Sequence, residues 1–174
     1  MGVQASLQSL LVRQAMALTS GWEARYPHPW LIWEPGVWKV PSPTNKLAAT
    51  QFAESAPDRP QKGDCLCFEL RSTTGTLRVG RAPENEIVIN DATVSREHLV
   101  LVRVGAVWNA DALPGAKNTA VRGVPLVPGT RVELASGDRL SVGGVTLSYL
   151  SPDKLKLRLQ AEAKRLSQSG NASS

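Results

Sequence analysis

Short apolar runs separated by turn residues fill the chain between residues 64 and 150, and this pattern limits the fold more than any other feature. The runs lie at residues 65–70, 76–79, 86–89, 98–104, 107–108, 132–134, 139–142 and 145–150. Glycine, serine, asparagine and aspartate stand between them. Strands this short, with turn residues every few positions, are typical of antiparallel sheets. The sequence therefore predicts an all-β antiparallel β-sandwich over residues 64–150.

The first 40 residues differ in texture and are expected to form an N-terminal extension. Apolar residues recur at helical spacing over residues 3–18, which predicts a helix that packs on its own domain. A partner-binding or membrane-surface helix is the other interpretation. Four of the five tryptophans follow, at positions 22, 30, 33 and 38. The Pro-Gly pair at 35–36 suits a turn between residues 30–33 and 37–40, which predicts a Trp-rich hairpin.

Two further segments complete the expected organisation. Residues 41–63 are rich in proline and polar residues without periodicity, which predicts a flexible linker. Residues 151–174 begin with Ser151-Pro152-Asp153, which suits the start of a helix. Basic residues are frequent beyond that start. We therefore expect a C-terminal basic helix and tail.

The formal net charge of +5 lies in the flanks of the chain. Residues 63–150 hold nine basic and nine acidic residues, residues 1–62 six and four, and residues 151–174 five and two. A domain that binds nucleic acid usually carries the basic excess itself, so we expect no nucleic-acid partner. Neither a bilayer-length apolar stretch nor a secretory signal stands out, which favours a cytoplasmic protein without a membrane partner.

The cysteine pattern does not suggest a metal or redox site. Cys65 and Cys67 are two residues apart on an expected strand, so they point to the same face and cannot easily pair with each other. We expect small buried thiols and no metal. A nucleophile elbow, a P-loop and a metal cluster are all missing from the sequence. The prediction is a non-enzyme without a cofactor.

Two arginines and a serine are spaced so that they can meet. Gly80-Arg81 is followed, fourteen residues after Arg81, by Ser95-Arg96. The β-branched run at 86–89 and the turn residues at 90–93 predict a short strand and a turn between them. Two guanidinium groups and a hydroxyl suit a phosphate dianion. The alternative interpretation pairs both arginines with surface glutamates, which would contribute little to stability.

The order of these motifs resembles the forkhead-associated (FHA) domain. The matching residues are Gly80-Arg81, Asn85-Glu86-Ile87-Val88-Ile89, Val94-Ser95-Arg96-Glu97-His98, Trp108 with Asp111, Val132, Gly137-Asp138 and Gly143-Gly144. The resemblance covers roughly Asp64 to Leu150, about half of the chain. It implies a sandwich of about eleven strands, here with short flanking helices at both ends, that binds phosphothreonine peptides through the loops at one end.

The resemblance also implies roles for single residues. Arg81 would contact the phosphate and the peptide, Ser95 would donate its hydroxyl to a phosphate oxygen, and Arg96 would support the same phosphate. His98 would brace the binding loops from behind, and Gly80 would allow the chain to turn. Two more residues, Asn85 and Gly123, are expected to support the site structurally.

The next loop departs from the family pattern, which is usually Asn-Gly-Thr followed two residues later by Asn-Gly. Aligned on Thr119 and Gly123, Lys117 stands at the first asparagine and Asn118 at the glycine, while Arg122 replaces the second asparagine. Asparagine tolerates a positive φ better than most residues, so Asn118 can stand in for glycine. We expect peptide contacts from Lys117, Asn118 and Thr119, with either Asn118 holding the peptide backbone or Lys117 adding charge.

These features predict a phosphothreonine-peptide-binding signalling adaptor that acts downstream of a Ser/Thr protein kinase. Its partners would be Thr-phosphorylated proteins, the kinase or the substrates of that kinase. The alternative is a phosphate-independent interaction or assembly module, suggested by the altered loop and the clustered tryptophans. Self-association is a further hypothesis, because Thr44 in the linker has Leu47 at the +3 position that this family commonly reads.

Overall fold

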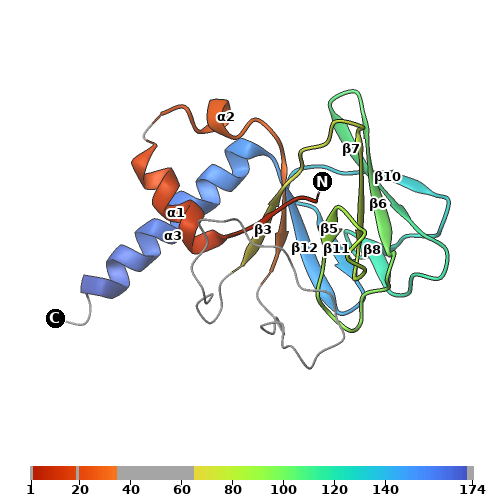
Figure 1. Cartoon of the computed structure of the whole chain (residues 1–174). Coiled ribbons are helices and arrows are strands. Elements are labelled where there is room, and N and C mark those ends of the chain that lie inside the picture. Colours follow the sequence, from red (N-terminus) through yellow and green to blue (C-terminus); the bar gives the residue numbers. More distant parts are fainter. Residues whose placement is uncertain (1, 19, 35–64, 172–174) are drawn as a thin grey trace.

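A computed structural model of the chain describes residues 2–18, 20–34 and 65–171. Two β-sheets pack face to face, and a layer of helices covers the outer side of the larger sheet (Figure 1). The described residues form twelve strands, against about eleven expected. The predicted fold class, an all-β sandwich with short flanking helices, is therefore confirmed.

The larger sheet has seven strands in the order β1-β3-β2-β12-β11-β8-β9. These strands are β1 (Ala5–Leu7), β3 (Leu66–Glu69), β2 (Trp30–Trp33), β12 (Val145–Leu150), β11 (Arg139–Val142), β8 (Thr119–Val121) and β9 (Val124–Pro125). All neighbours in this sheet are antiparallel. Both edge strands, β1 and β9, are short, which limits the exposed backbone edge.

The smaller sheet has five strands in the order β10-β7-β6-β4-β5. These strands are β10 (Arg131–Glu133), β7 (Val107–Ala112), β6 (Leu99–Val104), β4 (Thr76–Gly80) and β5 (Ile87–Val88). The β4–β5 pair is parallel and the other pairs are antiparallel. In β7, Trp108, Ala110 and Ala112 are buried while the residues between them are more exposed, as expected for a strand with one face on the core.

The predicted helix over residues 3–18 is correct only in its second half. Ala5–Leu7 forms strand β1, which pairs with β3, and helix α1 spans Gln8–Ala17. Both end residues of β1 are buried in the core between the sheets. The apolar residues of this stretch fit a period of two as well as the helical period, and pairing with β3 decides between the two.

Trp30–Trp33 is a central strand and not one arm of a two-stranded hairpin, which corrects a second prediction. It is paired with β3 on one edge and with β12 on the other. All four residues are buried, because one face meets the sandwich core and the other meets the helical layer. A strand that is covered on both faces appears in the sequence as a continuous apolar run, without alternation of apolar and polar residues. The other expected arm, residues 37–40, lies outside the described residues.

The predicted domain boundaries therefore need correction. Residues 1–40 were expected to form a separate extension, but they contribute two strands to the larger sheet, so the sandwich does not begin at residue 64. Both strands precede the predicted linker in the sequence. The linker itself, residues 41–63, lies outside the described residues. The sandwich is thus assembled from two parts of the sequence.

The described tryptophans of the N-terminal segment are interior residues. Trp22, Trp30 and Trp33 are 0%, 2% and 3% exposed. Trp22 packs on Tyr26 with ring centroids 4.5 Å apart and donates from Nε1 to the carbonyl of Pro152 at 3.1 Å. These three tryptophans therefore pack within the chain and are not exposed for assembly with a partner. Trp38 lies outside the described residues.

Three helices form the outer layer over β2 and β3 (Figure 1). They are α1, α2 (Trp22–Arg25) and α3 (Pro152–Asn171), and α3 agrees with the predicted C-terminal helix. A second apolar cluster lies between the layer and the sheet; it contains Leu11, Val12, Trp22, Tyr26, Trp30, Ile32, Cys65, Cys67, Leu155 and Leu159. Both cysteines are buried, as predicted, and they do not form a disulfide. Within the described ranges, no helix is long and apolar enough to span a lipid bilayer.

An ion pair fixes α3 to the edge of this layer. The guanidinium of Arg158 bonds both carboxylate oxygens of Glu34, and its Nε donates to Gln8 Oε1 at 3.0 Å. Burial alone raises the pKa of Glu34, but the hydrogen bonds from Arg158 and Ser148 outweigh it and lower the pKa below 4.5. The pair therefore joins α1, α3 and the residue that follows β2.

Candidate functional site

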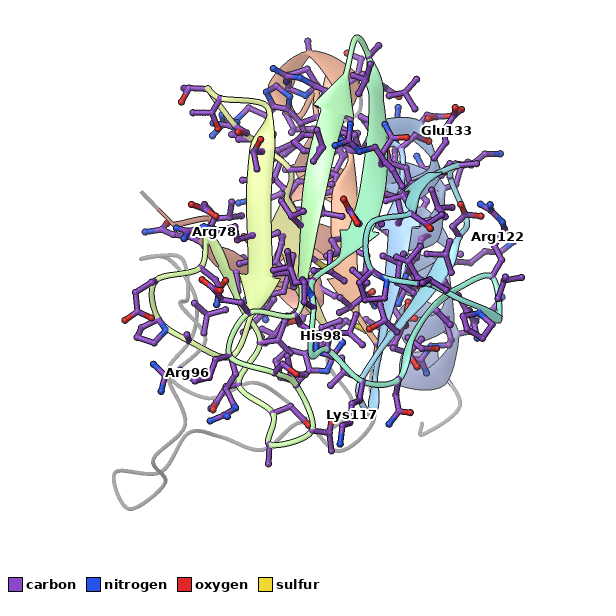
Figure 2. All side chains as sticks on the ribbon, turned by 90° about the vertical axis from the view of Figure 1, so that its right-hand side faces the viewer. Arg78, Arg96, His98, Lys117, Arg122 and Glu133 are labelled. Atoms are coloured by element: carbon purple, nitrogen blue, oxygen red, sulfur yellow. The ribbon has the colours of Figure 1, made fainter. Side chains whose placement is uncertain are left out.

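The loops at one end of the sandwich hold most of the predicted site residues. They are the loops after β4, before β6 and before β8, together with the β11–β12 turn. Figure 2 shows Arg96 and Lys117 at this end, with His98 just inside it, whereas Arg122 and Glu133 lie away from it. Residues far apart in the sequence therefore meet here because strands β4, β6, β8 and β11 all begin or end at this side.

Arg81 is held by the loop that carries Ser95. Its backbone N–H donates to the Ser95 carbonyl at 2.9 Å, and its Nε donates to the Val94 carbonyl at 3.0 Å. Within the described part of the chain, its terminal guanidinium nitrogens make no further hydrogen bond or ion pair, and the same is true of the Ser95 hydroxyl. The Arg81 guanidinium and the Ser95 hydroxyl can therefore donate hydrogen bonds to a ligand.

One of the surface glutamates, Glu86, pairs with a different arginine, Arg78. Arg78 donates to the Glu86 carboxylate from Nε at 3.1 Å and from its terminal nitrogen at 3.0 Å, and its backbone N–H donates to the same group at 2.7 Å. Burial raises the pKa of Glu86, but the hydrogen bonds from Arg78 outweigh it and lower the pKa overall. Glu86 is therefore occupied by Arg78, and Arg81 is not neutralised by it.

Gly80 and Asn85 hold the backbone of Arg96. A Cβ on residue 80 would lie 2.3 Å from the Arg96 carbonyl oxygen, so only glycine allows the two segments to approach this closely. Asn85 is 3% exposed and donates from Nδ2 to the carbonyls of Arg96 at 2.6 Å and Ala82 at 2.8 Å. The side chain of Arg96 is exposed and has no ion pair among the described residues. Glycine is thus required at position 80 because of this close contact, and not because of an unusual backbone angle.

His98 links two of the loops from inside. It is fully buried; its Nδ1 accepts the backbone N–H of Ser95 at 3.0 Å, and its Nε2 lies 2.8 Å from Thr119 Oγ1. Because Nδ1 accepts, the ring proton belongs on Nε2, which then donates to Thr119. Burial lowers the pKa of His98 below 6.5, in agreement with a neutral ring. The residue predicted to brace the loops is bonded to both.

The loop before β8 has the geometry that its altered sequence requires. Asn118 has φ of +57°, the left-handed conformation expected for a residue in place of glycine. Its carbonyl accepts the backbone N–H of Gly143 at 3.1 Å. Lys117 and Asn118 are exposed, while Thr119 is buried against His98. Lys117 therefore presents its ammonium group at the same end as Arg96 (Figure 2).

A further contact holds the loops together, and the sequence analysis missed it. Thr93 Oγ1 accepts the backbone N–H of Gly144 at 2.7 Å and bonds Asp91 Oδ1. A Cβ on Gly143 would lie 2.3 Å from the Thr93 carbonyl oxygen. The sequence signal for this contact is the pair Gly143-Gly144, which belongs to the matching family pattern but was given no role at the site. The β11–β12 turn thus supports the loop before Ser95 and the loop before Thr119 at the same time.

Gly123 lies outside this loop cluster. It has φ of +77° and forms the β8–β9 turn with Arg122, beyond the end of β8 that is distant from Thr119. Arg122, with φ of +53°, pairs with the buried Asp138. Gly123 therefore serves the hairpin turn, and the structure does not bring it together with the other predicted support residues.

The charges at the loop end are mixed. Arg81, Arg96 and Lys117 supply positive charge, and a hollow of about 500 Å³ adjoins Ser95 and Arg96. Glu84 and Glu97 also line this hollow. Fork-shaped donors and a neutral hydroxyl on fixed loops suit a tetrahedral anion, while the two carboxylates oppose one. The arrangement favours capture of an anion over chemistry on it.

Comparison with known proteins identifies the domain. Residues 77–143 match the family described as FHA domain, so this chain contains an FHA domain. That family is a phosphopeptide-recognition family and is generally non-catalytic. Over 88 residues, half of this chain, the sequence is 35% identical to an FHA domain-containing protein of Arabidopsis thaliana. The match spans only 22% of that protein's length. Strands β1, β2, β3 and β12 lie outside the family match.

Several solved structures are also similar to this chain. The FHA domain of an Arabidopsis thaliana hypothetical protein is 33% identical, with a TM-score of 0.45, and the match covers 53% of this chain and 77% of the other. EmbR of Mycobacterium tuberculosis, solved in complex with a low-affinity phosphopeptide, is 26% identical, with a TM-score of 0.41 and coverages of 44% and 20%. The FhaA FHA domain, complexed with the intracellular domain of Rv3910, is 26% identical, with a TM-score of 0.43 and coverages of 48% and 86%.

Proposed function

We propose that the loop end of the sandwich binds a phosphothreonine segment of a partner protein. Arg81, Ser95 and Arg96 contact the phosphate, and Lys117 and Asn118 contact the peptide beside it. Thr119 was expected to contact the peptide as well, but it is buried against His98 and supports the loop. Gly80, Asn85 and His98 keep these loops in place. The domain family supports this assignment, and the protein is then an adaptor without catalytic activity.

One observation carries the proposal more than any other. The Nε of Arg81 is fixed to the Val94 carbonyl, one residue before Ser95, and the Arg81 and Ser95 backbones are bonded at 2.9 Å. An arginine that is oriented in advance loses less conformational entropy when it binds an anion. Its terminal nitrogens have no acid partner among the described residues. The chain thus holds a cation ready beside a hydroxyl.

The energetics fit a reversible interaction. A phosphothreonine carries nearly two negative charges and three acceptor oxygens. Each charge-assisted hydrogen bond contributes about 1.5–3 kcal/mol, so three of them supply roughly half or more of the 8 kcal/mol that corresponds to micromolar affinity. Backbone and side-chain contacts of the peptide must supply the rest, which suits an interaction switched by phosphorylation.

A peptide titration tests the proposal. The whole chain is titrated with matched peptides that contain phosphothreonine, phosphoserine or unmodified threonine, and binding is followed by calorimetry. We expect selective binding of the phosphothreonine peptide and a loss of about 10–100-fold in Arg81→Ala. Arg139→Ala, which removes an exposed charge from the opposite end of β11, is the control and should bind normally. Equal binding of phosphorylated and unmodified peptides would contradict the proposal.

The kinase and the location belong to the same proposal. A phosphothreonine reader depends on a Ser/Thr kinase, so we place the chain downstream of one, in the cytoplasm. Thr-phosphorylated substrates of that kinase are the expected partners. This is tested by treating lysate with or without phosphatase and then capturing proteins on the immobilised wild-type chain. We expect the partners to be captured from untreated lysate and not from phosphatase-treated lysate. Capture that is unchanged by phosphatase favours the other candidate function.

That other candidate is phosphate-independent assembly. The replacement of asparagine by Lys117 favours it, since the family's usual backbone contact is altered there. Self-association through phosphorylated Thr44, which lies outside the described residues, is a variant of the first proposal. If Thr44→Ala abolishes kinase-induced dimerisation, the loops of one copy bind the linker of another.

A further inference from the structure

An apolar groove lies between the C-terminal end of α1 and the middle of α3, on the helical layer and away from the loop end. It encloses about 320 Å³ and is lined by Ala15, Met16, Leu18, Leu159, Gln160 and Ala163. Five of these six side chains are apolar. Met16 is 66% exposed, so a large apolar side chain stands in water at the rim of the groove.

The two helices beside the groove differ in length. The ten residues of α1 extend about 15 Å and the twenty residues of α3 about 30 Å. Figure 1 shows the last turns of α3 running on past α1. Leu159 is fully buried under α1, whereas Ala163, one turn further on, is only partly buried. From this point on, α1 therefore covers the apolar face of α3 less completely.

Basic residues outnumber acidic residues on the two helices that form the groove. Together, α1 and α3 contain six basic and two acidic residues. Arg13 lies one turn before Met16 on α1, and Lys164 lies one turn after Gln160 on α3. Neither forms a salt bridge among the described residues, while Arg158 and Arg165 are paired with Glu34 and Glu162. An occupant of the groove thus meets two cations that are not neutralised.

We propose that this groove binds an acidic amphipathic helix of a partner protein. The apolar face of such a helix fills the hollow beside Met16 and covers Ala163, and its carboxylates face Arg13 and Lys164. Helix-in-groove docking of this kind needs apolar residues at i, i+3 or i+4, and i+7 on the bound segment. Charge complementarity sets the choice of partner, because it adds attraction and excludes basic sequences.

A second copy of this chain fits the groove less well. It would bring the same α1–α3 face, with its excess of four positive charges, against an identical one. An anionic lipid surface satisfies the charge, but a surface is flat and does not enter a hollow between two helices. Both remain as outcomes of the experiment.

The test uses the whole chain and a designed probe. The probe is a fluorescent helical peptide of about 15 residues, or four turns, with leucine at the i, i+3, i+4 and i+7 positions and glutamate elsewhere. A second peptide has lysine in place of glutamate. We expect saturable binding of the acidic peptide, followed by fluorescence anisotropy, that weakens with salt, and no binding of the basic peptide.

Matched variants place the binding on the groove. Met16→Glu should weaken binding at least about tenfold, because it puts a charge into an apolar contact. Leu157→Glu is the control, since Leu157 is 56% exposed on the same helical layer but does not line the groove. Lys164→Glu should weaken binding, and Lys154→Glu, the same change ten residues earlier on α3, should do so less. Circular dichroism verifies that each variant is folded.

The remaining outcomes overturn the proposal. Absence of saturable binding, equal binding of both peptides, or equal effects of Met16→Glu and Leu157→Glu each contradict it. Sedimentation velocity that shows dimers lost on Met16→Glu assigns the groove to a second copy. Co-sedimentation with phosphatidylglycerol vesicles, lost in the same variant, assigns it to a lipid surface. Arg81→Ala should leave peptide binding at the groove intact, so this test is independent of the phosphate site.

Discussion

The carbonyl oxygen of Arg96 occupies the space that a Cβ on Gly80 would need, with only 2.3 Å between the two positions. This contact brings the end of β4 against the loop that carries Ser95 and Arg96. The proposed phosphate contacts therefore depend on the absence of a Cβ at Gly80. Backbone atoms on the other side cannot turn away as a flexible side chain would.

Gly80→Ala should destabilise the domain by about 1–3 kcal/mol, because the added methyl group forces the two segments apart. Phosphothreonine-peptide binding should fall with it, even where the protein remains folded. Urea unfolding and peptide calorimetry measure the two effects. Gly105→Ala is the control: Gly105 has φ of +64° but nothing within 4 Å of a new Cβ, so it should cost about 1 kcal/mol and leave binding unchanged.

His98 should make the stability of the domain depend on pH. Its pKa in the folded state is lowered below 6.5 by burial, so the unfolded chain takes up a proton first as the pH falls. The contribution of His98 is therefore complete above about pH 6.5 and is lost as the pH falls through the folded-state pKa. Protonation of Nδ1 would also break the bond from Ser95. Urea unfolding from pH 7.5 to about 5 should show the decline.

The other histidine gives the control for this prediction. His28→Gln should retain the decline in stability below pH 6.5. NMR titration of the imidazole resonances separates the two residues directly. An imidazole of His98 that titrates at or above 6.5 would contradict the buried neutral ring.

The pair of Glu34 and Arg158 should matter at neutral pH and not in acid. Glu34→Gln leaves a half-buried guanidinium without its carboxylate, which should cost about 1–3 kcal/mol at pH 7. The pKa of Glu34 is lowered below 4.5 in the folded state, so its contribution is present above that pH and is lost as the pH falls further. The difference between wild type and Glu34→Gln in urea unfolding should therefore shrink below about pH 4.5. A difference that persists in acid would contradict this account.

Most strands of the sandwich, including β3, could be predicted from short apolar runs between turn residues. The apolar runs that form β6, β7 and β12 alternate apolar with polar residues or end at glycine turns. The motifs around Arg81 and Ser95 indicated the order of the strands through their resemblance to the FHA family. For Trp30–Trp33 the extended conformation could be predicted but the pairing could not, because its partner β3 lies beyond a long intervening segment. A single sequence contains no record of which distant strand a run will pair with.

The candidate site likewise contains residues that could be predicted from the sequence and contacts that could not. Arg81, Ser95 and His98 belong to a spaced motif, and the left-handed conformation of Asn118 follows from its place in the family pattern. The bond between Thr93 and Gly144 was not predictable, because it joins residues 51 positions apart through a side chain and a backbone group. Gly123 fits the pattern but lies in a turn outside the loop cluster, since three residues of β8 separate that turn from the site.

Glu97 should weaken phosphopeptide binding. It lines the hollow beside Ser95 and Arg96, where a phosphate dianion would meet its negative charge. Like charges at an exposed position repel by about 0.2–1 kcal/mol, so Glu97→Gln should raise affinity by up to about fivefold. Calorimetry at low and high salt checks this, because the gain should shrink as salt screens the charges. Glu133→Gln, which removes a carboxylate away from the loop end (Figure 2), should leave affinity unchanged.

Thr93 should act on binding through loop position rather than through contact. Thr93→Val keeps the shape of the side chain but removes the oxygen that accepts from Gly144 and bonds Asp91. The loss of these bonds should cost about 1 kcal/mol of stability and loosen the loop that carries Ser95. Hydrogen exchange at residues 91–98 should become faster, and peptide affinity should fall several-fold. Thr93→Ser keeps the oxygen and should restore both; failure of serine to rescue, with loop exchange unchanged in valine, would show that the β11–β12 turn does not position the site.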